Sequence, residues 1–204
     1  MPPTLRLYTD FVCPYCFIAE QSTVPRLLRE FELTLDWRGF ELHPGTPRGG
    51  VPLATLFRGV PVQAMHERVL QFGARFGVAP FSPPDVLRNT RRALAVAELA
   101  RDRGRLEPFR AGAFEAHWRQ GKDLEADRDL AEIARAAGLD PEEALSAADD
   151  PAMLARVDDK QADARANGVT GIPTFILGDE EIVGCQPYEV LEAAALGAGV
   201  PRRS

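Results

Sequence analysis

The stretch Asp10-Phe11-Val12-Cys13-Pro14-Tyr15-Cys16 contains two cysteines separated by a proline and an aromatic residue. It follows Leu5 to Thr9, where apolar and polar side chains alternate as in a β-strand, and it precedes a helical pattern. This position places Cys13 at a helix N-terminus, where unpaired backbone N–H groups and the helix dipole stabilise a thiolate. Cys16 lies one helical turn further on, on the same side. We interpret the pair as a redox active site with Cys13 as attacking nucleophile and Cys16 as resolving thiol.

Two other uses of a C-x-x-C pair fit the sequence poorly. Structural zinc normally takes four ligands, but the third cysteine, Cys185, is single and distant, and the three histidines show no metal-ligand spacing. A purely structural disulfide between Cys13 and Cys16 would close so small a ring that it would hardly restrict the unfolded chain. We therefore predict no metal site.

Length and charge narrow the class of protein. A chain of 204 residues suits one domain, or one domain with a large insertion. Its 30 acidic and 24 basic residues are interspersed and give a net charge of -6, which argues against nucleic acid as a partner. No segment has the apolar length of a signal peptide or a membrane span, so we expect a cytoplasmic protein without a membrane partner. Cytoplasmic thiols are kept reduced, which favours a catalytic role for the cysteine pair.

The flanking sequence predicts a β-α-β unit. A helix following Cys16 is expected to bend at Pro25, and a second strand is expected within Glu32 to Leu42. The segment from His43 to Val60 is rich in proline and glycine and predicts a connection. From there to about residue 167 the pattern is helical throughout.

Two helix starts stand out in this middle region. Ser82-Pro-Pro-Asp85 predicts the start of a long helix from Val86 to Arg103, and Asp140-Pro-Glu-Glu143 repeats the pattern. After a helix ending near Asn167-Gly168, the chain predicts a hairpin and a last helix. The hairpin strands are Thr174 to Leu177 and Glu181 to Val183, and the helix runs from Pro187 to about Leu196.

This order predicts an α/β protein, a thioredoxin fold with a large all-helical insertion between its βαβ and ββα halves. We expect residues 1–45 and 150–204 to form the thioredoxin-like domain and residues 46–149 to form the insertion.

Several segments carry a family resemblance. They are Asp10 with Cys13-Pro14-Tyr15-Cys16, Trp37-Arg-Gly-Phe-Glu-Leu-His-Pro44, Asn89-Thr90, Asp129-Leu130 through Gly138-Leu139, Gly168-Val-Thr-Gly-Ile-Pro-Thr-Phe175 and Gly184-Cys-Gln-Pro187. Through them the chain resembles DsbA-like thioredoxin-fold proteins of the cytoplasmic FrnE type. These are related to 2-hydroxychromene-2-carboxylate isomerases and kappa-class glutathione transferases.

The resemblance implies a protein disulfide oxidoreductase with a cis peptide bond between Ile172 and Pro173, lying against the cysteine pair. It implies Cys13, Cys16 and Pro173 as catalytic residues. Substrate contacts are expected from Asp10, Pro14, Tyr15, Asn89, Thr90 and Ile172. The expected partners are thiols and disulfides of proteins or small molecules, with glutathione as a candidate co-substrate, no resident cofactor, and a homodimer as a candidate assembly. The C-P-Y-C sequence is similar to that of glutaredoxins, which implies a reduction potential between those of thioredoxin and DsbA.

Alternatives from other functional classes stay open. The related isomerases and transferases carry serine at the position of Cys13, which favours thiol–disulfide exchange here. The segment Asn89-Thr90-Arg-Arg-Ala-Leu94 nevertheless resembles the isomerase branch. A glutathione-dependent isomerase or transferase therefore remains an alternative, as does a redox-sensing or polypeptide-binding module whose cysteines do not turn over.

Individual residues also have two interpretations each. Leu7 occupies the place of the thioredoxin buried carboxylate, so Asp10 either replaces that group or caps the helix. Cys185 is either an inert buried thiol or a third thiol that exchanges with Cys16 or with a substrate. Arg88, Arg91 and Arg92 either contact an anionic ligand or form a solvated face, while His117 and Trp118 are expected in the core or at the subdomain interface.

Overall fold

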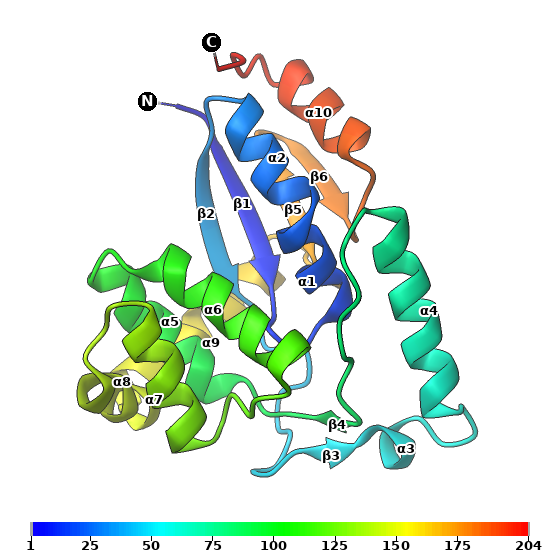
Figure 1. Ribbon diagram of the computed structural model, residues 1–204. Coiled ribbons are helices and arrows are strands. Elements are labelled where there is room, and N and C mark those ends of the chain that lie inside the picture. The colour runs from blue at the N-terminus through cyan, green and yellow to red at the C-terminus, as the bar shows by residue number, and fades with distance from the viewer. Residues whose placement is uncertain (1, 204) are drawn as a thin grey trace.

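The computed structural model describes residues 2–203 and is built around a four-stranded sheet of order β2-β1-β5-β6. β1 pairs in parallel with β2, whereas β5 runs antiparallel to both β1 and β6. The strands are β1 (Thr4–Thr9), β2 (Thr34–Gly39), β5 (Thr174–Leu177) and β6 (Glu180–Val183). This places the N-terminal strand, which leads to the cysteines, beside the strand that follows Pro173 (Figure 1).

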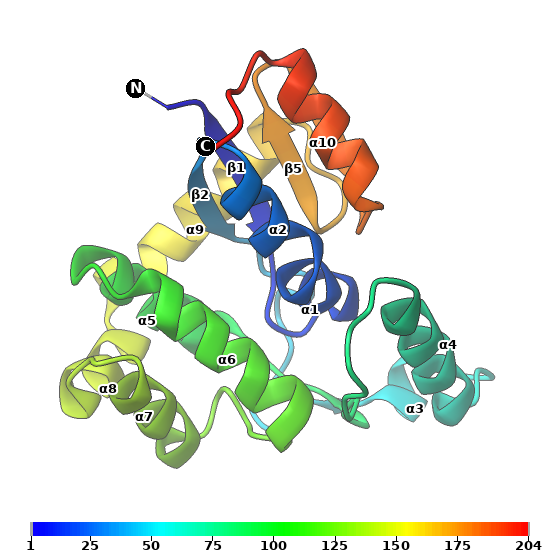
Figure 2. The same ribbon diagram turned by 45° about the horizontal axis from the view of Figure 1, so that its top comes forward.

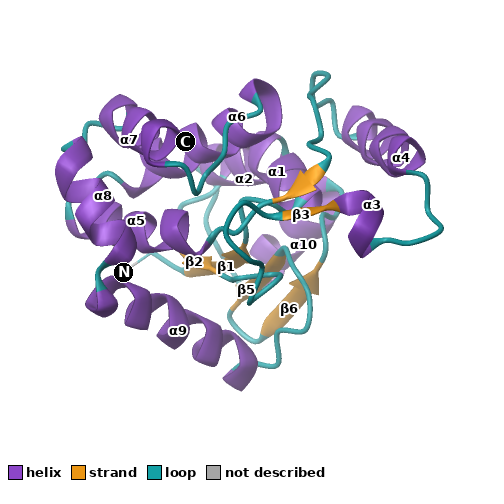
Figure 3. Ribbon diagram, turned by 90° about the horizontal axis from the view of Figure 1, so that it is seen from below, coloured by secondary structure: helices purple, strands orange, loops and turns teal. Residues whose placement is uncertain are grey.

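Helices cover both faces of the sheet. One face carries α1 (Pro14–Gln21), α2 (Thr23–Glu30) and α10 (Tyr188–Gly197). The view in Figure 3 shows α9 (Pro151–Ala166) on the opposite side of the strands from α1 and α2. α9 contacts both β2 of the sheet and α5 of the middle region, so it joins the two parts of the molecule.

The chain between β2 and α9 forms the predicted helical insertion. Its elements are β3 (Val51–Pro52), α3 (Leu53–Leu56), α4 (Val62–Arg75), β4 (Val86–Leu87), α5 (Arg91–Asp102), α6 (Leu106–Gln120), α7 (Asp127–Ala136) and α8 (Pro141–Asp149). The thioredoxin fold with a helical insertion is thereby confirmed. The expectation that the insertion is all-helical is wrong, because β3 and β4 pair as a two-stranded sheet within it. The predicted domain boundaries at residues 45 and 150 stay a proposal. The first and last residues of the predicted thioredoxin-like domain, 1 and 204, lie outside the described part of the chain.

The strands and several helix ends agree with the sequence analysis. β1, β5 and β6 lie within a residue of their predicted positions. α8 begins as predicted, with the Asp140 carboxylate accepting the N–H of Glu143 at 2.9 Å. The sequence Asp140-Pro-Glu-Glu143 therefore predicted the start of α8 correctly.

The predicted helix start at Ser82-Pro-Pro-Asp85 is wrong. Val86 and Leu87 pair as a short antiparallel ribbon with Val51 and Pro52, and helix α5 begins only at Arg91. The Asn89 side chain, one residue before the N-cap Thr90, accepts the N–H of Arg91 at 2.8 Å and so satisfies the first backbone N–H of α5. Pairing with a distant segment outweighs the local helix signal here.

The predicted bend at Pro25 is also wrong. The helix divides instead at Ser22, whose backbone (φ -128°, ψ -81°) is not helical, so two helices result. Pro25 is the third residue of α2, where a backbone N–H would have no intrahelical acceptor. The proline therefore costs α2 no hydrogen bond.

Within residues 2–203, no helix is both long and apolar enough to cross a membrane.

Candidate active site

Cys13 and Cys16 lie at the start of α1, immediately after the turn that ends β1. Cys13 is the residue before the first helical turn, and Pro14 occupies the first helical position, where its missing N–H is not needed. The Cys13 N–H donates to the Asp10 carbonyl at 3.2 Å and closes the turn. Both cysteines are free thiols and are buried, at 3% and 0% exposure respectively. The structure thus brings the two sulfurs together under the helix N-terminus.

The loop before β5 faces the first cysteine. The peptide bond between Ile172 and Pro173 is cis. The Cys13 thiol donates to the Ile172 carbonyl, with Sγ and oxygen 3.7 Å apart. This meeting follows from the sheet, because β1 and β5 are neighbours in which Tyr8 stands opposite Thr174. Two segments about 160 positions apart in the chain therefore form one site.

The two thiols have different surroundings. Burial raises the pKa of Cys16 well above its ordinary value of 9.0, and the hydrogen bond and charge of Cys13 raise it further. Contacts with the Thr9 side chain and the Asp10 backbone lower that pKa again, but their effect is smaller. Cys16 is therefore protonated at neutral pH and needs a base before it can attack a disulfide.

Asp10 is the buried carboxylate of this site. Burial raises its pKa from 3.8 to about 7. The hydrogen bond from the Leu42 N–H and the nearby Thr90 side chain act in the opposite direction and lower the pKa, but their effect is smaller. Leu42 donates to Oδ2 at 2.8 Å, whereas Oδ1 is buried without a partner among the described residues. Since no side chain caps α1, the interpretation of Asp10 as a helix cap is wrong. Leu7, at the alternative position, is fully buried and apolar.

Asn89 and Thr90 lie behind Asp10. Thr90 is buried at 2% exposure and contacts the Asp10 carboxyl group. Asn89 donates to the Thr46 carbonyl at 2.5 Å and accepts from Arg91, so its amide group is engaged within the protein. Their expected role in substrate binding stays a prediction, while the structure gives them a role in holding the segment around Asp10.

Comparison with known proteins agrees with this geometry. The model of the DSBA-like thioredoxin domain family matches residues 4–195. The chain belongs to the DSBA-like thioredoxin domain family. A probable DsbA oxidoreductase, SCO1869 from Streptomyces coelicolor, is 27% identical, with a TM-score of 0.86 over 97% of this chain and 90% of that one.

Two further solved structures show the same fold as this DsbA-like protein. A 2-hydroxychromene-2-carboxylate isomerase is 21% identical, with a TM-score of 0.75 over 95% of this chain and 94% of its own. The cytosolic disulfide reductase DsbM from Pseudomonas aeruginosa, solved with GSH, is 19% identical, with a TM-score of 0.70 over 95% of this chain and 99% of its own. The fold is thus shared by proteins named as oxidoreductases and by one named as an isomerase.

The insertion of this DsbA-like protein supports the active-site loop from behind. Trp118 of α6 donates its indole N–H to the Phe11 carbonyl at 2.8 Å. Phe114, one turn earlier, packs edge-on against the Phe11 ring at 5.1 Å. Trp118 also stacks on Phe17 of α1 at 5.6 Å. Trp118 lies at the predicted interface, but no local sequence pattern signals its hydrogen bond to the cysteine loop.

The arginines of the Asn89 segment are occupied by acids of the protein itself. Arg91 pairs with Glu41 and Asp158, and the buried Arg92 pairs with Asp127 and Asp149. These pairs tie α5 to neighbouring elements. The interpretation of this face as merely solvated is therefore wrong for Arg92.

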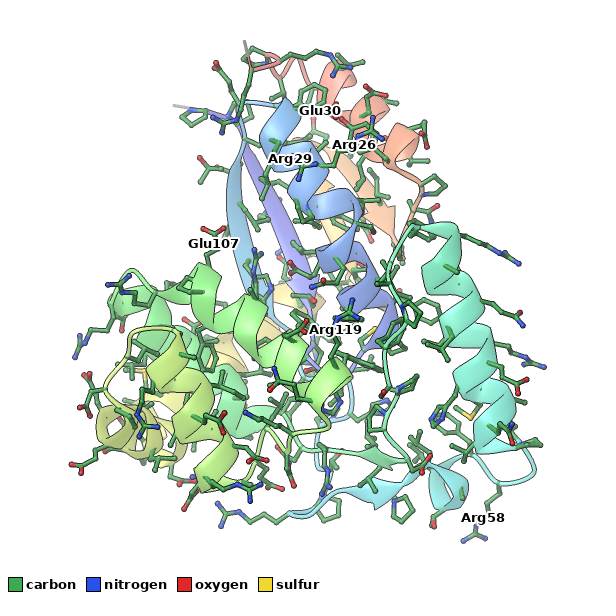
Figure 4. The ribbon with its side chains drawn as sticks, viewed as in Figure 1. Arg26, Arg29, Glu30, Arg58, Glu107 and Arg119 are labelled. Atoms are coloured by element: carbon green, nitrogen blue, oxygen red, sulfur yellow. The ribbon has the colours of Figure 1, made fainter. Side chains whose placement is uncertain are left out.

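Tyr15 faces the other side of the site, toward α4. It is 41% exposed, and its ring meets the Phe72 ring edge-on at 5.1 Å. Beyond Phe72 lies a cavity of about 640 Å³ between α4, α2 and the turn before α10. Figure 4 shows Arg26 and Glu30 on α2, of which Arg26 lines this cavity. The other lining residues are Ser22, Thr23, Phe72, Arg75, Phe76, Cys185, Gln186, Pro187, Tyr188 and Glu189.

Cys185 is 8% exposed and lies in the turn between β6 and α10. Burial raises its pKa to about 12, and the charge of Cys13 contributes to the rise. Its exchange with Cys16 or with a substrate therefore stays a prediction.

Proposed function

We propose that this protein is a thiol–disulfide oxidoreductase that acts through Cys13 and Cys16. The observation that carries the proposal is the arrangement of Cys13 at the N-terminus of α1, with its thiol 3.7 Å from the Ile172 carbonyl and the protonated Cys16 beneath it. A serine at position 13 could bind a thiolate but could not form a disulfide with a substrate. The cysteine at position 13 therefore favours exchange over glutathione-dependent isomerisation.

In the reductive direction, the Cys13 thiolate attacks one sulfur of a substrate disulfide, and the other sulfur leaves as a thiol after taking a proton. Cys16 then loses its proton and attacks Cys13, which forms the Cys13–Cys16 disulfide and releases the second substrate thiol. Asp10 is the proposed acceptor for the Cys16 proton, because its backbone contacts Cys16 and its carboxyl pKa is about 7. The same steps in reverse oxidise a substrate dithiol.

Substrate contacts are proposed for the residues that surround Cys13. Ile172 offers a carbonyl, Tyr15 an exposed ring, and Pro14 and Pro173 shape the two loops. We propose thiols and disulfides of proteins or small molecules as partners, glutathione among them, because DsbM has the same fold and was solved with GSH. We also propose a cytoplasmic location, in line with DsbM, and keep the homodimer as a prediction for size-exclusion measurement.

The test is turnover of a model protein disulfide by the wild type, Cys13→Ser and Cys16→Ser. We expect Cys13→Ser to lose at least about a thousandfold in rate, because no sulfur remains to attack. Cys16→Ser is expected to form the mixed disulfide at Cys13 but not the Cys13–Cys16 disulfide. Wild-type activity that survives Cys13→Ser, with glutathione-linked isomerisation, would favour the isomerase; no turnover by any form would favour a sensing or binding module.

Titration against glutathione buffers measures the reduction potential of the Cys13–Cys16 pair, which sets the direction of electron flow. We expect a reduction potential between those of thioredoxin, about -270 mV, and DsbA, about -120 mV. A value as low as that of thioredoxin would contradict the placement.

A further inference from the structure

The turn that carries Cys185 is attached to the same loop that faces Cys13. The Gly184 N–H donates to the Pro173 carbonyl at 2.7 Å, and the Cys13 thiol donates to the Ile172 carbonyl at 3.7 Å. Two consecutive residues, Ile172 and Pro173, thus hold Cys13 and the Cys185 turn to one loop. The backbone beside Cys185 is in this way tied to the loop that faces Cys13.

Cys185 also lines the cavity that adjoins the active site. The cavity shares Phe72 with the contact that covers Tyr15, the residue between the two catalytic cysteines. Phe72 thus lies between Tyr15 and the space that Cys185 borders. Cys16, at 0% exposure, lies on the buried side of Cys13 instead.

The charges agree with this arrangement. Burial raises the pKa of Cys185 to about 12, and the negative charge of a Cys13 thiolate adds to the rise. That contribution is absent once Cys13 is part of a disulfide, because a disulfide sulfur carries no charge. Formation of a mixed disulfide at Cys13 therefore removes part of the obstacle to ionising Cys185.

We propose that Cys185 is a second resolving thiol, which attacks a mixed disulfide at Cys13 from the cavity side; this inference rests on the proposed exchange activity. Cys185 gives up its proton and bonds to the Cys13 sulfur, the bond between Cys13 and the substrate sulfur breaks, and the substrate leaves as a thiol. With the first attack, two electrons and two protons pass from Cys13 and Cys185 to the substrate disulfide.

The resulting Cys13–Cys185 disulfide is connected to the main cycle. Cys16 attacks Cys13 from the buried side, forms the Cys13–Cys16 disulfide and returns Cys185 to its thiol form. The exchange needs no external oxidant, since one disulfide replaces another. The molecule can thus release a substrate by either of two thiols and still end in one oxidised form.

The experiment uses the full chain with Cys16→Ser, treated with oxidised glutathione. Intact-mass measurements follow the glutathione adduct on Cys13 after excess reagent is removed. We expect the adduct in Cys16→Ser to disappear at least about tenfold faster than in Cys16→Ser with Cys185→Ala, because the neighbouring thiol is held in place. Peptide mapping of the first variant should show a Cys13–Cys185 disulfide.

Cys16→Ser with Cys185→Ser is the matched control for folding, since serine preserves the size of the side chain, and it should retain the adduct as the alanine form does. Equal lifetimes of the adduct in all three variants would overturn the proposal while leaving the proposed function intact. Failure of Cys13 to accept glutathione or a protein disulfide at all would overturn both.

Discussion

Two helices of the insertion flank the cysteine loop, and they differ sharply in burial. α6 buries seven of its described residues, among which Phe114 and Trp118 contact the loop. Among the described residues of α4 only Gly73 is buried, and none of those of α3 is. In Figure 2, α6 lies against the body of the molecule while α4 stands beside α1 at its edge. The α6 side of the site is therefore tightly packed, whereas the side of α3 and α4 is largely exposed to solvent.

This difference follows from what each helix contacts. α6 meets the aromatic rings of the cysteine loop and α1, which bury large apolar surface. The arm formed by α3 and α4 leaves Leu56, Phe57 and Val60 exposed at its tip, near Arg58, which points away from the protein in Figure 4. The arm therefore exposes apolar side chains, whereas α6 packs against the cysteine loop and α1.

The largest expected effect is on the free energy of unfolding, which should depend far more on α6 than on the arm. Phe114→Ala, at a fully buried ring, should lower the free energy of unfolding by about 3–5 kcal/mol because it leaves a cavity. Phe57→Ala, at a ring 38% exposed on the arm, should cost less than about 1 kcal/mol. Urea unfolding of both variants checks this, and equal losses would end the comparison.

Asp10→Asn should change how stability depends on pH. The unfolded carboxyl loses its proton near 3.8 and the folded one only near 7, so the wild type loses stability from Asp10 as pH rises through this window. The difference corresponds to on the order of 4 kcal/mol, and the amide variant should lack it. The variant should also resolve mixed disulfides more slowly above pH 7. Asp179→Asn, at an exposed turn, is the control, and unfolding curves between pH 4 and 8 give the measurement.

Trp118→Phe tests whether the indole N–H supports the cysteine loop, because the variant keeps an aromatic ring but removes the hydrogen-bond donor. It leaves the buried Phe11 carbonyl without its donor at 2.8 Å, which should cost about 1–3 kcal/mol. Hydrogen exchange at the amides of residues 11–13 should accelerate. Unchanged exchange there would show that α6 is not what orders the loop.

The smallest effect is expected on the exposed side. Phe72→Ala removes the edge contact with Tyr15, worth about 0.5–1.5 kcal/mol. If the arm contacts protein substrates, KM for a protein disulfide should rise several-fold while kcat stays near the wild-type value. A fall in kcat alone would instead assign Phe72 to positioning of the cysteine loop.

Local patterns predicted the parts of the fold in which neighbours in sequence are also neighbours in space. The strand before Cys13, the proline-started helix after it and the Asp140 cap of α8 are of this kind. The helix prediction for Val86 to Thr90 was wrong because Val86 and Leu87 pair with Val51 and Pro52, which lie far away in the chain. A helix signal cannot report a strand pairing of that range.

For the candidate site, the sequence by itself determined the chemistry: two sulfurs one helical turn apart at a helix start, which is a property of spacing and dipole. Only the tertiary structure decided their surroundings. It brought the Ile172 carbonyl to Cys13, buried Asp10 until its pKa reached about 7, and tied the Gly184 backbone beside Cys185 to the Pro173 carbonyl. Burial and electrostatics depend on every element packed around a group, and these come from all along the chain.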